Sequence, residues 1–194
     1  MNDFKNAIAL TGGISTGKST VCNILKLHGF SIIDADSIAH KILDENSIKI
    51  GDMFGEGFLK DSKIDRKMLG GLIFSNPDAK KKLEAFIHPL IKAEILNQAN
   101  ICEAKNKPYI VDIPLFYETK NYPIDKVVVV YCPQKIQIER LCKRDNIDES
   151  TALQKISNQM NIDEKKSMAT FVIDNSEDFK YLQKQIEKFV KEVL

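Results

Sequence analysis

Gly12-Gly13-Ile14-Ser15-Thr16-Gly17-Lys18-Ser19 is the stretch that decides the fold of this chain. It matches the phosphate-binding loop pattern of a glycine, four residues, and then Gly-Lys-Ser. An apolar run, Ala7-Ile8-Ala9-Leu10, comes before it, and a helical pattern with an apolar stripe follows and ends at Gly29. A glycine-rich turn that merely precedes a helix is the alternative. The strand before the loop and the helix after it favour phosphate binding.

Each part of this loop has a chemical purpose. Glycines let the backbone curl so that successive N–H groups point inward toward an anion. A helix opening at Gly17 adds the positive end of its dipole, Lys18 can reach the outer phosphates, and the Ser19 hydroxyl can bind Mg2+. The loop therefore predicts a site for a nucleoside triphosphate with Mg2+.

Five short apolar runs alternate with helical stretches along the chain. Strands this apolar are buried on both faces, and strands separated by helices form parallel sheets with right-handed crossovers. The predicted fold class is therefore α/β, with a five-stranded parallel sheet flanked by helices. The predicted strands are Ala7–Leu10, Phe30–Ile33, Tyr109–Val111, Val127–Val130 and Phe171–Ile173.

Two stretches interrupt this alternation. Residues from about 61 to 103 show helical spacing and no convincing strand, and Pro89 should start a new helix there or kink the old one. Residues 140–166 are dense in charge and poor in large apolar side chains, so we expect a helical, mobile flap that buries little. We expect a single domain over 1–194.

Composition excludes several classes of protein. The chain has 194 residues, 43% of them hydrophobic, and its 28 basic and 27 acidic residues leave a formal charge of +1. We therefore expect no nucleic-acid partner, and no apolar run approaches the roughly 20 residues of a membrane helix. The stretch from Met1 to Lys5 shows no secretory leader, and the four cysteines form no Cys-x-x-Cys pair. Reduced thiols and a cytoplasmic location are the expectation.

Carboxylates follow two of the predicted strands. Asp34 and Asp36 come directly after the second strand, and Asp112 ends the third. Because ligands of an open parallel sheet bind outside the carboxyl ends of its strands, we expect these side chains beside the loop. Asp34 and Asp36 can hold Mg2+ or accept a proton from an attacking hydroxyl, or one of them can cap the following helix. Asp112 is the expected second, water-mediated Mg2+ anchor.

Arg140 and Arg144 lie four residues apart in the charged stretch, so they share one helix face. Guanidinium groups match phosphate oxygens and offset the charge that spreads during phosphoryl transfer. A solvated helix face is the ordinary explanation of such a pair. In a chain with a phosphate-binding loop, we favour contact with the phosphates.

The chain resembles the dephospho-CoA kinase family over nearly its whole length. The resemblance implies transfer of the ATP γ-phosphoryl group to the ribose 3′-hydroxyl of dephospho-CoA. It also implies a core like that of nucleoside monophosphate kinases at about 1–60, 106–139 and 167–194, a helical acceptor-binding part at about 61–105 and a lid at about 140–166. The segments that carry it are 10–20, Ile33-Asp34-Ala35-Asp36, 83–91 with His88-Pro89-Leu90-Ile91, Asp112-Ile113-Pro114-Leu115, Arg140 with Arg144-Asp145, and Val172-Ile173-Asp174-Asn175.

Roles for individual residues follow from the resemblance. Asp36 would be the base at the 3′-hydroxyl, Lys18 and Arg140 would complete the catalytic set, and Arg144 would reach the phosphates. Asn175 would lie near the adenine of ATP, and Ser19 and Asp112 would hold Mg2+. The loop positions expected to bind the nucleotide are Gly12, Gly13, Ser15, Thr16, Gly17, Lys18, Ser19 and Thr20. The positions expected to bind the acceptor are Asp34, His88, Asp112, Pro114 and Leu115.

Two departures from the family pattern bear on the site. The family usually has Gly-Ser-Gly-Lys where this chain has Ser15-Thr16-Gly17-Lys18. We expect nucleotide binding to survive, because a Cβ strains only loop residues that require a positive φ. In the lid, Ile162 and Lys165 follow Gln159 where many members carry arginine.

Other functions with a phosphate-binding loop are less well supported. Another small-molecule kinase with the same core stays open, because the acceptor is read by residues 61–103. A GTPase-type switch needs Asn-Lys-x-Asp, yet Asn106-Lys107 is followed by Pro108-Tyr109. A non-catalytic ATP-binding module would have no need for Asp36 beside paired arginines. We expect a monomer or a weak homo-oligomer.

Overall fold

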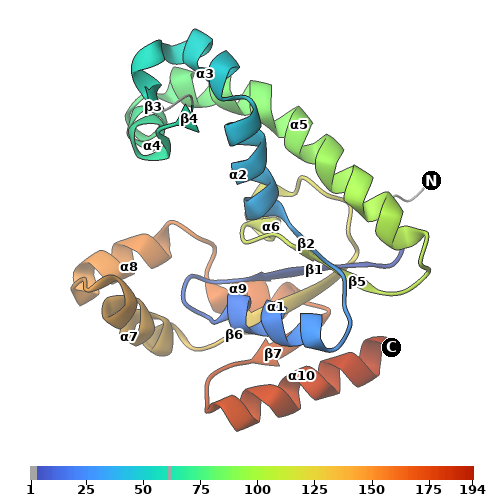
Figure 1. The fold of residues 1–194 in the computed structure, drawn as a ribbon. Coiled ribbons are helices and arrows are strands. Elements are labelled where there is room, and N and C mark those ends of the chain that lie inside the picture. Colours follow the sequence, from blue (N-terminus) through green and yellow to red (C-terminus); the bar gives the residue numbers. More distant parts are fainter. Residues whose placement is uncertain (1–3, 61–62) are drawn as a thin grey trace. The chain divides into compact units, whose positions relative to one another are not determined.

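The computed structural model describes residues 4–60 and 63–194. They form two compact units, one made of Met1–Ile33 with Ala99–Leu194 and the other of Asp34–Gln98. The elements labelled in Figure 1 are β1 (Ala7–Gly12), α1 (Lys18–Leu27), β2 (Ile32–Asp34), α2 (Ala35–Glu45), α3 (Ser47–Phe54), β3 (Leu59–Lys60), β4 (Lys63–Ile64), α4 (Arg66–Ser75), α5 (Pro77–Glu103), β5 (Tyr109–Asp112), α6 (Phe116–Thr119), β6 (Lys126–Tyr131), α7 (Gln134–Asp145), α8 (Glu149–Ser157), α9 (Ile162–Met168), β7 (Phe171–Asp174) and α10 (Phe179–Val193). A single 3-10 turn, Glu56–Phe58, precedes β3.

The five predicted strands form one sheet in the order β2-β5-β1-β6-β7. β1 is central and buried along its whole length, and it pairs in parallel with β5 and β6. Leu10 is in register with Asp112 on one side and with Val128 on the other. The predicted fold class is confirmed. This topology places the end of β1, and hence the loop, beside the end of β5.

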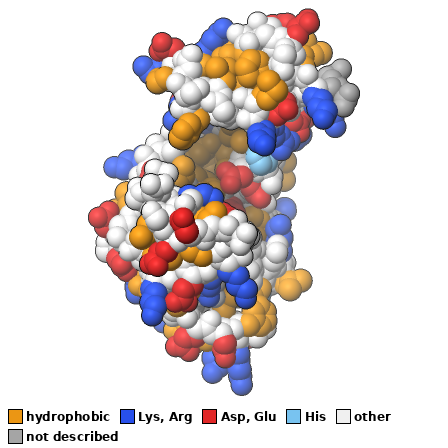
Figure 2. Space-filling view, turned by 90° about the vertical axis from the view of Figure 1, so that its left-hand side faces the viewer, with side chains coloured by type: hydrophobic (Ala, Val, Ile, Leu, Met, Phe, Trp, Pro, Cys, Tyr) orange, Lys and Arg blue, Asp and Glu red, His pale blue; other side chains and the backbone are white. Residues whose placement is uncertain are grey.

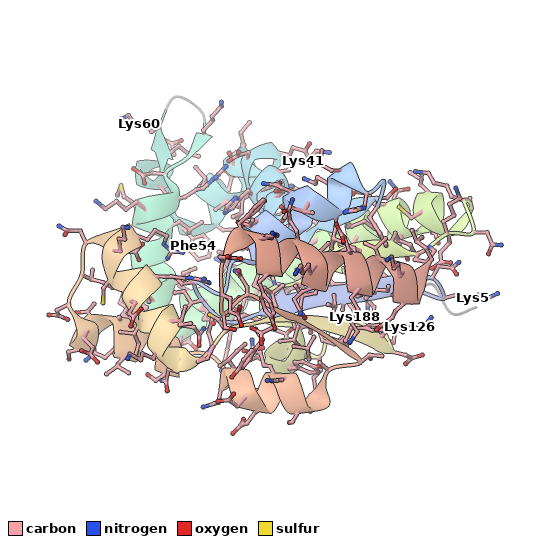
Figure 3. The ribbon with its side chains drawn as sticks, turned by 90° about the horizontal axis from the view of Figure 1, so that it is seen from below. Lys5, Lys41, Phe54, Lys60, Lys126 and Lys188 are labelled. Carbon is pink, nitrogen blue, oxygen red and sulfur yellow. The ribbon has the colours of Figure 1, made fainter. Side chains whose placement is uncertain are left out.

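One face of the sheet is covered by α1 and α10, as Figure 1 shows. Leu182, Ile186 and Phe189 of α10 are buried against the sheet, which confirms the amphipathic pattern of the C-terminal helix. Lys188 of the same helix, labelled in Figure 3, is exposed. The face of the molecule seen in Figure 2 carries charged side chains of both signs, interspersed.

The Asp34–Gln98 unit has a core of its own. Its buried apolar residues come from α3, β4, α4 and α5: Ile50, Ile64, Leu69, Leu83 and Ile87. This unit begins earlier in the chain than the acceptor-binding part expected from about 61, and Asp61 itself lies outside the described residues, as does part of the Met1 to Lys5 stretch.

One expectation for this unit is wrong, and one of the two alternatives for Pro89 does not apply. β3 and β4 form a short antiparallel pair with Leu59 opposite Ile64, where we expected no strand after 61. A two-residue strand is too short to show alternation in the sequence. Pro89 does not start a new helix, because α5 continues through it. A proline inside a long helix removes one backbone hydrogen bond, and the remaining bonds hold the helix together.

Among residues 4–60 and 63–194, no helix is both long enough and apolar enough to cross a bilayer.

Candidate active site

The loop between β1 and α1 starts at the end of the central strand. Gly17 is the N-cap of α1 and has a left-handed backbone, with φ 92° and ψ 21°. Its carbonyl accepts hydrogen bonds from the N–H groups of Thr20 and Val21, at 3.0 and 3.2 Å, and so begins the helix. Ser19 and Thr20, in the first turn, are exposed. The free N–H groups and positive end of α1 are therefore at the loop, as an anion site requires.

Side chains from distant elements fix the shape of the loop. Gln137 of α7 donates to the Ile14 carbonyl at 2.7 Å, and Gln159 accepts from the Ile14 N–H at 2.8 Å. Asn175, just after β7, donates its side-chain amide to the Thr16 carbonyl at 2.8 Å. Within the loop, the Thr16 hydroxyl donates to the Gly13 carbonyl at 2.9 Å.

This bracing explains why glycine is needed at Gly17. A Cβ added there would collide with the side-chain amide nitrogen of Asn175, and the φ of 92° is unfavourable for other residues. Ser15 also has a positive φ, 60°. The serine that departs from the family pattern therefore stands at the kind of position where a Cβ was expected to cause strain, and survival of nucleotide binding stays a prediction.

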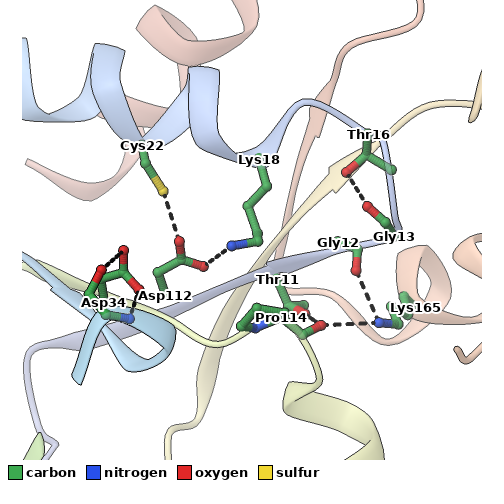
Figure 4. A network of polar contacts seen from close by, with 11 residues as sticks. Thr11, Gly12, Gly13, Thr16, Lys18, Cys22, Asp34, Asp112, Pro114 and Lys165 are labelled. Atoms are coloured by element: carbon green, nitrogen blue, oxygen red, sulfur yellow. Dashed lines mark hydrogen bonds and ion pairs between the residues drawn. The ribbon is translucent and has the colours of Figure 1, made fainter. Parts of the chain in front are cut away.

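Lys18 and Cys22 lie one turn apart on α1 and contact the same carboxylate (Figure 4). Lys18 Nζ lies 2.5 Å from Oδ1 of Asp112, and the Cys22 thiol donates to Oδ2 at 3.3 Å. Asp112 ends β5 and is 6% exposed. The structure thus brings together Lys18, which was predicted to bind the phosphates, and Asp112, which was predicted to hold Mg2+.

Lys165 was missed as a site residue by reasoning from the sequence. Its side chain is fully buried, and Nζ lies 3.0 Å from the Gly12 carbonyl and 2.8 Å from Oε1 of Glu118 (Figure 4 shows the Gly12 contact). A longer contact of 3.4 Å reaches the Pro114 carbonyl, which also accepts from the Thr11 hydroxyl at 2.8 Å. Lys165 therefore ties α9 to the start of the loop and to the chain after β5.

The expectation that residues 140–166 bury little is wrong for α9. Ile162 is 4% exposed and Lys165 is 0% exposed. The two residues are three apart, so they lie on the same face of the helix. In the sequence, the buried face of α9 is indicated only by the spacing of Ile162 and Lys165. The many charged residues around them make this spacing easy to overlook.

Arg140 and Arg144 of α7 have different partners. Arg140 donates through Nη2 to the Asn175 carbonyl at 3.0 Å. Arg144 donates through Nε to Asp145 at 2.8 Å, and Lys155 of α8 donates to the other oxygen of Asp145 at 2.8 Å. Hydrogen bonds from Arg144 first, and then from Lys155, hold the pKa of Asp145 well below its usual range. Arg140 is thus positioned at the residue that braces the loop, whereas Arg144 belongs to an exposed charge network.

The remaining predicted residues lie on other elements. Asp34 ends β2 and caps α2, since its side chain accepts from the Ser37 N–H at 2.9 Å and from the Ser37 hydroxyl at 2.8 Å. The capping alternative is therefore confirmed for Asp34. Asp36 is exposed in the first turn of α2, and His88 is exposed on α5. Leu115, after β5, is 39% exposed.

Comparison with known sequences identifies the family of the chain. The sequence profile of the dephospho-CoA kinase family matches residues 6–180. The chain belongs to this family. A dephospho-CoA kinase of Sulfurimonas denitrificans is 49% identical over 190 residues, covering 98% of this chain and 95% of that protein. One from Helicobacter pylori is 46% identical, covering 98% of this chain and 99% of that protein.

Two solved structures are similar to the chain over nearly its whole length. A dephospho-CoA kinase from Campylobacter jejuni superimposes with a TM-score of 0.76 at 39% identity, covering 97% of this chain and 96% of that one. A protein from Thermus thermophilus superimposes with a TM-score of 0.78 at 26% identity, covering 97% of each chain.

Proposed function

We propose that this chain transfers the γ-phosphoryl group of ATP to the 3′-hydroxyl of dephospho-CoA by in-line displacement, using the loop and the residues around it. Dephospho-CoA kinases are ATP-dependent and convert dephospho-CoA to coenzyme A, the last step of coenzyme A synthesis, and the chain belongs to that family. The observation that carries the catalytic proposal is the braced loop with Lys18 at its end.

Residues of the loop would bind the triphosphate of ATP. The N–H groups of Ser15, Gly17, Lys18 and Ser19 would surround the phosphate oxygens, and the Lys18 ammonium would leave Asp112 for the more highly charged tail. Asn175, which holds the Thr16 carbonyl, would lie close to the nucleotide. Arg140 and Arg144 would offset charge on the transferring group, and closure over the site would exclude water.

Ser19 and Asp112 fit the chemistry of Mg2+, which favours a hydroxyl, a carboxylate and phosphate oxygens over a cage of protein ligands. Asp112 is nearly buried and already lies beside a cation, the ammonium of Lys18. Ser19 and Asp112 would hold the ion, whose charge would offset that of the phosphates. Asp112 would then serve the metal through water while Lys18 serves the phosphates.

Asp36 is the residue that would act on the acceptor, dephospho-CoA. Asp36 would orient the 3′-hydroxyl and take its proton, and Asp34, whose carboxylate caps α2, would hold that turn in place. His88, Pro114 and Leu115 would contact dephospho-CoA. The acceptor-binding part at about 61–105 and the lid at about 140–166 belong to the same proposal.

We also propose a cytoplasmic monomer or weak homo-oligomer. The four cysteines all lie within the described residues and form no disulfide, which suits a reducing compartment.

Matched substitutions of the two aspartates test the catalytic proposal. Asp36→Asn should keep ATP affinity and lower turnover by about 100-fold or more, because the amide cannot accept the proton. Asp34→Asn should keep turnover within a few-fold, because asparagine caps a helix about as well as aspartate. Turnover is measured with ATP and dephospho-CoA, with the product identified by mass, and ATP affinity by calorimetry.

The opposite pattern, with Asp34→Asn inactive and Asp36→Asn active, would remove the base role from Asp36. Parallel assays with nucleosides and nucleoside monophosphates test acceptor identity. Phosphorylation of one of these in place of dephospho-CoA would contradict the proposed acceptor.

A further inference from the structure

Lys165 of α9 is a fully buried cation whose contacts reach two different segments of the chain. Nζ donates to the Gly12 carbonyl at 3.0 Å and to the Pro114 carbonyl at 3.4 Å, and it lies 2.8 Å from Oε1 of Glu118. Gly12 begins the loop that is proposed to bind ATP, whereas Pro114 lies in the segment that is proposed to bind dephospho-CoA. One ammonium group therefore contacts the donor side and the acceptor side of the proposed reaction.

Two further hydrogen bonds join the same segments without passing through Lys165. The Thr11 hydroxyl, in β1, donates to the Pro114 carbonyl at 2.8 Å. The backbone N–H of Met160, between α8 and α9, donates to Oε1 of Glu118 at 3.0 Å. The Pro114 carbonyl is thus held both from β1 and from α9.

The ammonium of Lys165 has no capacity left for a substrate. It has three N–H donors, and the oxygens of Gly12, Pro114 and Glu118 lie within hydrogen-bond distance of it. Its side chain is 0% exposed. A buried ion pair contributes little net stability compared with apolar side chains of similar size, so stability alone does not account for the pair. These contacts suit a positioning residue that does not touch the reacting atoms.

We propose that Lys165 fixes the separation of the loop and the segment after β5, and so aligns the acceptor hydroxyl with the γ-phosphate of ATP. The inference rests on the proposed function, because it needs ATP in the loop and dephospho-CoA against Pro114 and Leu115. A misplacement of reacting groups by about 1 Å can cost about 100-fold in rate. Loss of Lys165 should therefore slow the transfer more than it weakens the binding of either substrate.

The double variant Lys165→Met with Glu118→Gln removes this bridge without leaving a buried charge behind. Its kcat should fall by about 100-fold. The Kd of ATP and the Kd of dephospho-CoA, each measured alone by calorimetry, should stay within about threefold of the parent, because each substrate keeps its own contacts.

The ratio of the two products separates misalignment from a general loss of structure. A misaligned γ-phosphoryl group is transferred to water more often, so the variant should form more ADP than coenzyme A. The parent should form the two in equal amounts. A fall in the amount of folded protein would lower both products together and leave their ratio unchanged.

Thr11→Val tests the bridge from the side of β1 and leaves Lys165 in place. It removes one hydrogen bond to the Pro114 carbonyl, so kcat should fall by about fivefold and the ratio of ADP to coenzyme A should rise less than in the double variant. Thermal unfolding shows whether each variant is folded. If the double variant is unfolded, Thr11→Val decides the outcome.

Lys166→Met with Glu164→Gln is the matched control, because it makes the same two changes at exposed positions of the same helix. Lys166 contacts the ring of Tyr131, at 3.9 Å from its centroid. This control should match the parent in kcat and in the ratio of products.

Folded variants that keep kcat within twofold of the parent would overturn this inference and leave the proposed function standing. A lower kcat with an unchanged ratio of ADP to coenzyme A would also overturn it, because that result indicates a merely structural role. If the parent itself does not phosphorylate dephospho-CoA, the proposed function fails and the inference fails with it.

Discussion

Lys18 and Asp112 form an ion pair in which the Lys18 ammonium lies 2.5 Å from one carboxylate oxygen, while the Cys22 thiol donates to the other. The pair joins the first residue of α1 to the last residue of β5. Each partner has a second proposed task, Lys18 on the phosphates and Asp112 on Mg2+. The carboxylate therefore competes with ATP for the ammonium until the metal and the phosphates are both bound.

Asp112→Asn should affect ATP affinity measured without Mg2+ and turnover measured with Mg2+ in different directions. Without Mg2+, the variant should bind ATP at least as tightly as the parent, because Lys18 no longer has a carboxylate to leave. With Mg2+, turnover should fall by about 100-fold or more, because the amide is a poor substitute for a metal-anchoring carboxylate. Calorimetry in chelator and turnover in Mg2+ measure the two effects. Parental turnover in Asp112→Asn would contradict the metal role.

The contributions of Lys165 and Glu118 to the free energy of unfolding should depend on each other. Lys165→Met leaves Glu118 without its buried cation and the Gly12 carbonyl without its donor. Removing one partner of a buried pair costs about 3–5 kcal/mol, so the free energy of unfolding should fall by an amount of that order. Glu118→Gln leaves the fully buried Lys165 ammonium without its counter-charge, so its loss should be at least as large. Urea unfolding of both single variants and the double variant measures the coupling, and purely additive losses would contradict it.

Gly17→Ala should weaken both folding and nucleotide binding. Its Cβ would collide with the side-chain amide nitrogen of Asn175, at a φ of 92°. Left-handed strain alone costs about 1–2 kcal/mol, and displacing Asn175 would release the Thr16 carbonyl as well. Gly57→Ala is the control, because its Cβ would meet nothing within 4 Å. Thermal unfolding and ATP calorimetry compare the variants, and equal behaviour of the two would refute the bracing argument.

The stability of the protein should fall in alkaline solution through Cys132. Burial raises the pKa of this thiol to about 11, and the nearby Arg140 offsets part of that rise. The unfolded chain loses the thiol proton near its ordinary pKa, whereas the folded chain keeps it, so folding binds a proton and stability declines between the two values. The loss should reach roughly 2–3 kcal/mol.

Comparing each variant with itself at two pH values isolates this effect. Urea unfolding of the parent and of Cys132→Ala at pH 8 and pH 10.5 gives two differences. Packing changes caused by the substitution cancel within each variant. A difference of the same size in both proteins would show that Cys132 does not contribute.

The loop and the five strands were predictable because their signals are local. A buried strand shows itself as a short apolar run, and the glycines and Lys18 stand at fixed spacing within eight residues. β3 and β4 gave no such signal, because each is two residues long. The capping bond of Asp34 was foreseen as an alternative, since aspartate is common at that position.

Residues that act across long sequence separations could not be predicted in this way. Lys165 and Gly12 are 153 residues apart, and Asn175 and Thr16 are 159 apart. A lysine in a charged stretch is usually exposed to solvent. The burial of Lys165 could therefore be recognised only from its contacts in the structure. The strain at Ser15 likewise depends on Gln137, Gln159 and Asn175, which hold the peptides on either side of it.

The bracing of the loop has an electrostatic consequence. The carbonyl oxygens of Gly12, Gly13, Ile14 and Thr16 each accept a hydrogen bond from a side chain. The negative ends of these peptide dipoles are thus screened by donors, one of them the cationic Lys165. The Ile14 N–H is held by Gln159, whereas the N–H groups at the start of α1 remain available to a ligand. The loop is preorganised as an anion receptor, so an arriving phosphate meets an attractive field without first having to turn any oxygen aside.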